Sequence, residues 1–381
     1  MLKPALVLGG VTALLLTLLG ATTLSSYSWD LPPGFPPPLV PEDNPMTEAK
    51  VELGRHLFYD TRLSGNGAQA CASCHKQDLA FSDGLGVSVG STGERHPRNS
   101  QSLTNVAYNA TLTWGNPVLE ELEQQILVPM FGEFPVELGM TGKEEAIYAE
   151  LAADPLYERL FAEAFPNAAV TTSAVTTKHI VDALASFTRT LISGESRYDA
   201  YVYGGQRDAL TLSEKRGMDL FLSEKTECHH CHGGFNFSHS VKHQNNAQFV
   251  EKSFHNTGLY NLDEAGAYPL GNGGVFEITG KPGDMGKFRA PSLRNVELSA
   301  PYFHDGSAET LGEVLSFYEA GGRLTESGEH TGDGRRNPHK SGFVRGFSLS
   351  DRERTDLIAF LKSLTDETFI TNPAFSNPFT D

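Results

Sequence analysis

Every cysteine of the chain lies in one of two copies of the same five-residue pattern. The copies are Cys71-Ala-Ser-Cys74-His75 and Cys228-His-His-Cys231-His232. C-x-x-C-H is the attachment sequence of c-type haem, because two thiols add to the vinyl groups of one porphyrin and the following His reaches the iron as proximal ligand. A zinc site or a redox dithiol is the alternative use of such residues, and the additional histidines of the second copy suit zinc. Two complete copies with no other cysteine favour two covalently bound haem c groups.

Residues 1–26 predict export from the cytoplasm. Lys3 precedes an uncharged apolar run over residues 5–24, which is typical of a signal peptide and is nearly long enough for an N-terminal anchor. Because c-type haem is attached outside the cytoplasm, both observations predict a periplasmic protein, either soluble or N-terminally anchored. Residues 27–45 are rich in Pro and predict an extended surface segment.

The net charge of the chain restricts the classes of partner that it can bind by electrostatic attraction. A formal net charge of −17 argues against a nucleic-acid partner and against electrostatic binding to anionic lipid. An acidic surface suits a neutral or basic protein partner, and it equally serves solubility.

The surroundings of the two motifs indicate an internal duplication. Before each motif an amphipathic stretch ends in Leu-Phe and is followed by a loop. Helical periodicity also appears over residues 141–165, 176–193 and 348–364, with capping boxes at Thr141/Glu144 and Ser350/Glu353. The pattern predicts an all-α fold of two cytochrome c-like haem domains with long irregular loops. The predicted domains span 46–205 and 206–381.

A further helix is predicted after residue 309, and the last residue on its inward face is a tyrosine. Thr310 and Glu313 form a capping box, and the positions i, i+3, i+4 and i+7 that follow are apolar or aromatic: Leu311, Val314, Leu315 and Tyr318. On this helix alone, Tyr318 is an ordinary core tyrosine or a group whose oxygen binds a ligand.

Five stretches in order resemble the bacterial di-haem cytochrome c peroxidase family, which includes the MauG branch. They are LGRHLFYDTRLSGNG, CASCHKQDLAFSDG, RNSQSLTNVAYN, FRAPSLRNVELSAPYFHDG and TLGEVLSFY, and the resemblance covers about residues 46 to 365. In the peroxidases of that family a Met on the last of these helices is the sixth ligand of the C-terminal haem. Counting from His304, that position falls on Tyr318, as in MauG, so the resemblance implies that Tyr318 ligates the second iron.

The resemblance also implies an open, peroxide-reactive N-terminal haem. The peroxidases place a His over that iron from the loop that corresponds to residues 86–98, and the register puts Ser91 there. His96 is nearby but next to Pro97 and out of register, so it is interpreted as a surface loop residue, with ligation of the iron as the alternative.

The distal pocket of that haem is expected from residues 114–140. The family pattern of Gln, Pro and acid falls on Gln125, Pro129 and Glu137, with Glu133 as a rival acid because FGEF lengthens the interval. Trp114 matches the Trp between the two haems of the family. A carboxylate beside the iron can move the protons of hydrogen peroxide.

A calcium ion and two haem-propionate partners complete the implied site. The family binds calcium through one Asn side chain and two backbone carbonyls, which by register are Asn99, Ser299 and Pro301. Arg289 and Arg294 are candidate partners of haem propionates or plain surface residues.

Three stretches look most like the MbnH group of MauG-type enzymes, which oxidise a Trp on a small partner protein to kynurenine. They are YSWDLPPGFPPPLVPEDNPMT, PMFGEFPVELG and FLKSLTDETFITNPAFSNPF. The resemblance therefore implies a di-haem oxidoreductase that uses hydrogen peroxide to form a high-valent state shared by two haems and oxidises a residue such as Trp on a small exported partner protein.

Two other functions remain open. A cytochrome c peroxidase that reduces hydrogen peroxide with electrons from a small redox protein would call for Met at position 318 and a His ligand in the 86–98 loop. A non-catalytic electron carrier would need two haems with both axial positions filled.

Overall fold

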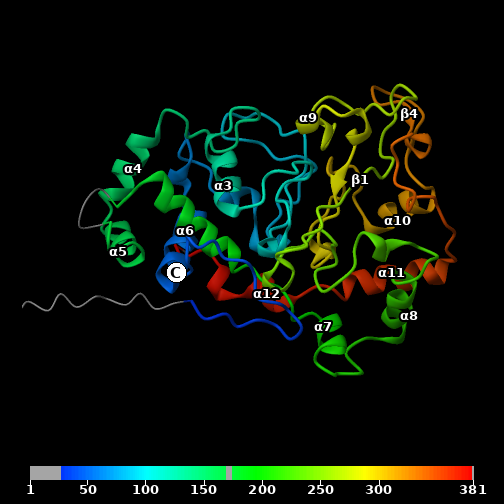
Figure 1. Cartoon of the computed structure of the whole chain (residues 1–381), viewed down its shortest axis with the longest axis horizontal. Helices are drawn as coiled ribbons and strands as arrows, with labels where there is room; N and C mark the ends of the chain where they lie inside the picture. The colour runs from blue at the N-terminus through cyan, green and yellow to red at the C-terminus, as the bar shows by residue number, and fades with distance from the viewer. Residues whose placement is uncertain (1–26, 169–173, 380–381) are drawn as a thin grey trace, which may run out of the picture.

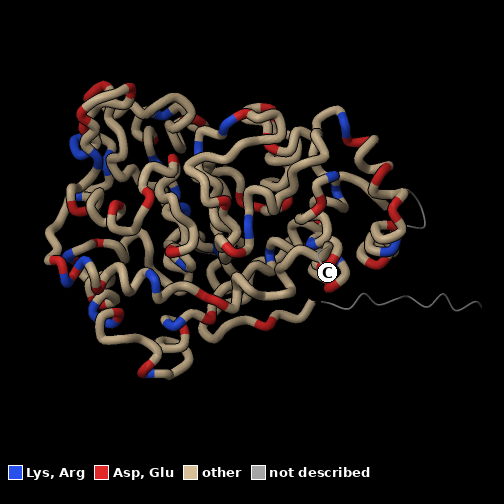
Figure 2. Tube along the Cα trace, turned by 180° about the vertical axis from the view of Figure 1, so that it is seen from behind, with Lys and Arg blue, Asp and Glu red and all other residues tan. Residues whose placement is uncertain are grey.

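The structure is a computed structural model that describes residues 27–168 and 174–379 (Figure 1). The predicted signal or anchor segment, residues 1–26, lies outside the described residues. Within the described ranges, no helix combines the length and the apolar character needed to cross a bilayer. Acidic and basic residues are interspersed along the whole trace and do not form long runs of one sign (Figure 2).

The fold is predominantly helical. In chain order the helices of the described residues are α1 (Glu48–Tyr59), α2 (Cys71–Cys74), α3 (Leu122–Phe131), α4 (Glu144–Ala152), α5 (Pro155–Ala164), α6 (Thr177–Arg189), α7 (Arg197–Val202), α8 (Leu212–Phe221), α9 (Phe276–Thr279), α10 (Leu311–Glu319), α11 (Asp351–Lys362) and α12 (Glu367–Thr371). Long irregular segments connect them, as expected from the sequence.

Two very short antiparallel sheets were not predicted. The strands β1 (Phe254–His255) and β2 (Phe288–Arg289) pair with Phe254 opposite Arg289. The strands β3 (Leu324–Thr325) and β4 (Gly332–Asp333) pair with Leu324 opposite Asp333. Two-residue strands carry no alternating pattern that a sequence could reveal.

Each half of the molecule contains one closely packed helix pair. The helices α4, α5 and α6 lie toward one end of the molecule and α8, α10 and α11 toward the other (Figure 1). In the first pair, α1 packs on α6 so closely that a Cβ at Gly54 would lie 2.0 Å from the Ala183 carbonyl oxygen. In the second pair, α8 packs on α11, and a Cβ at Gly217 would lie 1.9 Å from the Asp356 carbonyl oxygen. Each glycine is thus required by the approach of a neighbouring backbone.

A second contact repeats in both halves. Asn105 accepts a hydrogen bond from the Ser193 amide at 2.7 Å, and Asn295 accepts one from the Asp366 amide at 2.7 Å. Both asparagines have positive φ, at 57° and 58°, which Asn tolerates better than most residues. The two halves therefore share this contact between an irregular segment and the chain that follows a long helix.

Segments from both termini cross between the halves. In the segment 27–45, which has no helix, Phe35 packs against Tyr108 and Phe235 at ring-centroid distances of 6.0 and 4.9 Å. At the other terminus, Phe369 of α12 and Phe375 join the core formed by α1 and α6. The domain boundary near residue 205 stays a prediction.

One predicted helix is divided into two helices in the structure. Residues 141–165 form α4 and α5, because Pro155 lacks an N–H and starts α5, with Asp154 as its N-cap. The predicted capping box at Thr141 is wrong, since Lys143 is the N-cap of α4 and the Thr141 hydroxyl donates to Phe131 O. The other two predicted capping boxes, on α10 and α11, are confirmed.

Candidate functional site

Two cavities lie behind the two motifs. The first has a volume of about 320 Å³, and its wall brings together the predicted residues Cys71, Cys74, His75, Trp114, Gln125, Pro129 and Glu137. The second has a volume of about 230 Å³ and is lined by Cys228, Cys231, His232 and Tyr318 among others. Each C-x-x-C-H motif therefore presents both thiols and its His to a partly open cavity.

The two motif histidines are held in the same way. His75 Nδ1 lies 2.8 Å from Phe81 O, and His232 Nδ1 lies 3.1 Å from both Phe237 O and Pro291 O. A carbonyl that accepts from Nδ1–H selects the tautomer with a free Nε2, which is the arrangement of metal-ligating histidines. Burial lowers the pKa of His75, and burial lowers that of His232 to about 4, so both rings are neutral at pH 7.

Helix α3 supplies one wall of the first cavity. Gln125 and Pro129 lie one turn apart and both face it. Pro129 has no N–H, so the carbonyl of Gln125 lacks its usual helical partner. Gln125 Oε1 is buried, and among the described residues it has no hydrogen-bond partner. The side chain is therefore free to accept a hydrogen bond from a small molecule in the cavity.

The acid in this cavity is Glu137. Burial raises the pKa of its carboxyl to about 7, which places its titration near neutral pH. Glu133 is exposed and does not line the cavity. The inserted residues form a small turn closed by the pairing of Glu133 with Val136, and this turn returns Glu137 to the cavity.

Short backbone contacts hold Glu137 in place. The Ser91 amide donates to Glu137 O at 2.7 Å, and the Leu138 amide donates to Pro129 O at 2.9 Å. A Cβ at Gly90 would lie 1.8 Å from Val136 O, so only glycine permits this approach.

The loop that carries Ser91 differs from the expectation in one respect. Ser91 does not line the cavity, and an open position on the first haem stays a prediction. His96, which we interpreted as a surface residue, does line it, and burial lowers its pKa. The loop folds back through the bond from His96 N to Ser88 O, which sequence register alone could not reveal.

The inward face of α10 lines the second cavity as predicted. Leu311, Val314, Leu315 and Tyr318 all contribute to its wall. Burial, reinforced by the nearby thiols of Cys231 and Cys228, raises the pKa of Tyr318 above its ordinary value. The Tyr318 side chain is partly buried, and among the described residues no hydrogen bond to its hydroxyl is formed.

Trp114 lies between the two cavities, and His304 lies beside it. Trp114 lines both of them, and its indole N–H donates to Asn99 O at 2.9 Å. His304 lines the second cavity, stacks on Phe288 at a centroid distance of 3.7 Å and lies 6.5 Å from the Trp114 ring. Burial lowers the pKa of His304 to about 3, and its Nε2 has no partner in the described chain. Sequence reasoning assigned no role to His304, although its position in PYFHDG is a signal of a site residue.

The two arginines have different roles. Arg289 is buried in the wall of the second cavity, burial lowers its pKa to about 10, and its Nη1 has no partner in the described part of the chain. Such a guanidinium requires an anion, which a haem propionate would supply. Arg294 instead forms a buried bidentate pair with Asp199, at 2.8 and 2.9 Å, so neither of its expected roles applies.

These features fit two haem c groups. The four thiols form no disulfide, each neutral His has a free Nε2, and the unpartnered Arg289 nitrogen faces the second cavity. The expected calcium ligands Asn99, Ser299 and Pro301 all line the second cavity, and calcium binding there stays a prediction.

Known proteins share these features. Residues 48–207 match the model of the family described as di-haem cytochrome c peroxidase. The chain is 33% identical over 327 residues to the methylamine utilization protein MauG of Methylorubrum extorquens, covering 86% of this chain and 81% of that protein. It is 34% identical over 371 residues to the cytochrome-c peroxidase IdrP1 of Pseudomonas sp. strain SCT, covering 93% and 92%. A crystal structure of a MauG-like protein associated with microbial copper homeostasis is 50% identical, with a TM-score of 0.90 over 93% of this chain and 100% of that one.

Proposed function

The chain belongs to the di-haem cytochrome c peroxidase and MauG family, and from that premise we propose that it oxidises a residue, a Trp in the first instance, on a small exported partner protein. As a member it is a peroxide-using di-haem oxidoreductase. In our proposal Cys71, Cys74 and His75 hold the peroxide-reactive haem. Cys228, Cys231 and His232 hold the second, with Tyr318 as its sixth ligand.

The observation that carries the proposal is the position of the Tyr318 phenol. It lines the second cavity with Cys228, Cys231 and His232, and it has no hydrogen-bond partner among the described residues. A phenolate is a hard anionic ligand that favours oxidised iron, whereas the thioether of Met favours the reduced form. A tyrosine in this place suits a haem that holds oxidising equivalents.

When bound, a haem held by Cys71, Cys74 and His75 would supply the redox chemistry for cleaving the O–O bond of peroxide. Glu137, with a pKa near 7, accepts the first proton of the peroxide and returns it to the departing oxygen. Gln125 Oε1 accepts a hydrogen bond from the peroxide and orients it. Each peroxide takes two electrons and two protons to give two waters, and the protein substrate supplies the electrons.

Trp114 gives the route between the sites in this proposal. Its indole lies in the wall shared by both cavities, so it shortens the distance that an electron must cross. The substrate residue then reacts at the protein surface and need not enter a cavity.

The 50% identity to the MauG-like protein supports this branch, and we place the reaction in the same setting, microbial copper homeostasis, in the periplasm.

A second candidate is a cytochrome c peroxidase that takes electrons from a small redox protein. It is favoured by the 34% identity to the cytochrome-c peroxidase IdrP1 over nearly the whole chain.

One experiment separates the two. The fully ferric di-haem protein is mixed with one equivalent of hydrogen peroxide without reductant, and the absorption and EPR spectra are followed. If both ferric signals are lost together and return slowly, the oxidising equivalents are shared and the first proposal stands. If nothing reacts until one haem has been reduced, the protein is a peroxidase and the assignment to Tyr318 fails.

A further inference from the structure

We propose that Glu224, His229 and His230 form a surface binding site for one divalent transition-metal ion, for which Cu²⁺ is the strongest binder. Glu224, His229 and His230 line neither cavity, although the neighbouring Glu227 lines the second one. The proposal does not depend on the proposed function. The three residues each offer one ligand atom, and these atoms all lie within 4.8 Å of one another.

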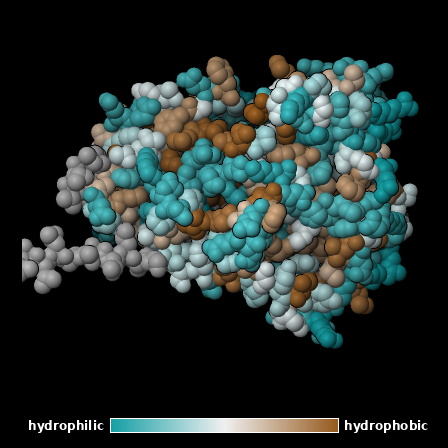
Figure 3. All heavy atoms as spheres, in the orientation of Figure 1, coloured by the Kyte–Doolittle hydropathy of each residue, from teal (hydrophilic) through white to brown (hydrophobic). Residues whose placement is uncertain are grey.

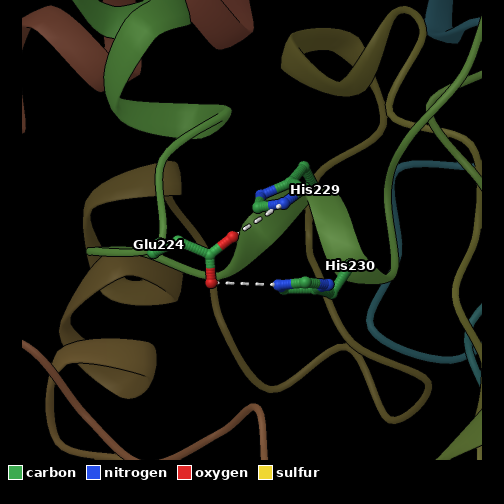
Figure 4. Close-up of side chains that lie close together, drawn as sticks. All are labelled: Glu224, His229 and His230. Atoms are coloured by element: carbon green, nitrogen blue, oxygen red, sulfur yellow. Dashed lines mark hydrogen bonds and ion pairs between the residues drawn. The ribbon is translucent and has the colours of Figure 1, made fainter.

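The Glu224 carboxylate lies between the two histidine rings (Figure 4). Glu224 directs one carboxylate oxygen toward each ring, with Oε1 3.5 Å from His229 Nε2 and Oε2 3.5 Å from His230 Nε2. Two ligands bonded to one tetrahedral ion at 2.0–2.1 Å are about 3.4 Å apart. The two carboxylate–imidazole distances are therefore close to the spacing of ligands around one ion.

Glu227 offers a fourth ligand. Its side chain is only 5% exposed, and Oε2 lies 2.9 Å from His230 Nε2. Nevertheless, no hydrogen bond reaches Oε2 within the described chain. Arg345 pairs with the other oxygen, Oε1, and leaves Oε2 directed at the histidines. A cation bound by this oxygen and by His230 Nε2 would take the place of the ion pair between them and satisfy both groups.

The surroundings hold the rings while leaving them accessible. His230 stacks on Phe343 at a centroid distance of 4.4 Å and an angle of 14°, which restricts its rotation. The side chains of His229 and His230 are 25% and 29% exposed, and that of Glu224 is 76% exposed, so an ion can enter from solvent.

Haem attachment does not compete for these ligands. Cys228, Cys231 and His232 line the second cavity, whereas the two histidines between the cysteines do not. The motif thus presents one face to the cavity and another to solvent. Two imidazoles and a carboxylate select Cu²⁺, Ni²⁺ or Zn²⁺ over Ca²⁺ and Mg²⁺, and Cu²⁺ binds most tightly in the usual order of divalent ions.

The test uses the purified di-haem protein, first freed of divalent ions with a chelator. Titration with Zn²⁺ by calorimetry is expected to show one ion per chain. Titration with Cu²⁺ by EPR is expected to show one copper signal with hyperfine structure from two nitrogens, and tighter binding than Zn²⁺. Absence of stoichiometric binding of both ions overturns the proposal.

Variants locate the ion. Glu224→Gln and His230→Ala are each expected to lower the Zn²⁺ affinity roughly tenfold or more. Glu52→Gln is the matched control, because it removes another carboxylate that lies beside a single histidine, 3.4 Å from His56 Nδ1. Equal affinities of Glu224→Gln and Glu52→Gln overturn the assignment. If His230→Ala reduces haem attachment, Glu224→Gln still decides, since it lies outside the attachment motif.

Discussion

Replacing Glu137 by Gln tests whether a buried acid serves the first cavity. Burial raises the pKa of this carboxyl from 4.5 to about 7. At about 1.36 kcal/mol per pKa unit, the charged form is disfavoured by about 3 kcal/mol in the folded protein. Gln has nearly the same shape and carries no charge at any pH.

The sign of the stability effect follows from proton binding. Between pH 4.5 and pH 7 the folded protein holds a proton on Glu137 that the unfolded chain releases, so this group makes the folded state less stable as pH rises. The full penalty of about 3 kcal/mol is present above pH 7. Glu137→Gln is therefore expected to match the wild type near pH 4 and to exceed its unfolding free energy by up to about 3 kcal/mol at pH 8.

Two measurements check these expectations. Chemical denaturation at several pH values gives the unfolding free energies, with the exposed Glu133→Gln as the control that should show no such trend. Stopped-flow mixing with hydrogen peroxide gives the reaction rate, which should rise with pH up to about 7 in the wild type and fall by about 10²–10⁴ in Glu137→Gln. The argument is refuted if the unfolding free energies of the wild type and Glu137→Gln change with pH in parallel and the peroxide rate is the same in both.

Three further changes test other parts of the structure. Tyr318→Phe removes the proposed ligand oxygen, so one ferric EPR signal should change while the other stays, and peroxide should no longer deplete both signals together; two unchanged signals would count against ligation. Gly90→Ala forces a Cβ to within 1.8 Å of the carbonyl that precedes Glu137, so the peroxide rate should fall by about 10²-fold in stopped-flow measurements even though Glu137 is intact. Asp199→Ala leaves the Arg294 guanidinium buried without its partner, so denaturation should show a loss of about 3–5 kcal/mol, and a loss near zero would contradict the buried pair.

Much of the architecture is encoded locally. The C-x-x-C-H spacing specifies the attachment chemistry because both thiols and the His must reach one porphyrin. The capping boxes of α10 and α11 and the inward face of α10 follow from the 3.6-residue period, which acts within a few turns. The division between α4 and α5 was also readable at Asp154-Pro155, but the continuous apolar periodicity outweighed it.

The candidate site depends on contacts between distant segments. The resemblance implied that Trp114 lies between the haems, but no local pattern marks it, and the packing of the two halves places it in both cavity walls. The sequence around Arg289 and Arg294 does not distinguish the two residues. In the structure Arg289 has a nitrogen without a partner in the described chain, whereas Arg294 pairs with Asp199.

The sequence by itself therefore determined which cofactor chemistry this chain can hold, because covalent attachment depends on residues only a few positions apart. Only the tertiary structure decided which groups surround that chemistry. Glu137 rather than Glu133 faces the first cavity, and His96 joins it, because burial and electrostatics depend on what packs around a side chain, and those neighbours come from elsewhere in the chain.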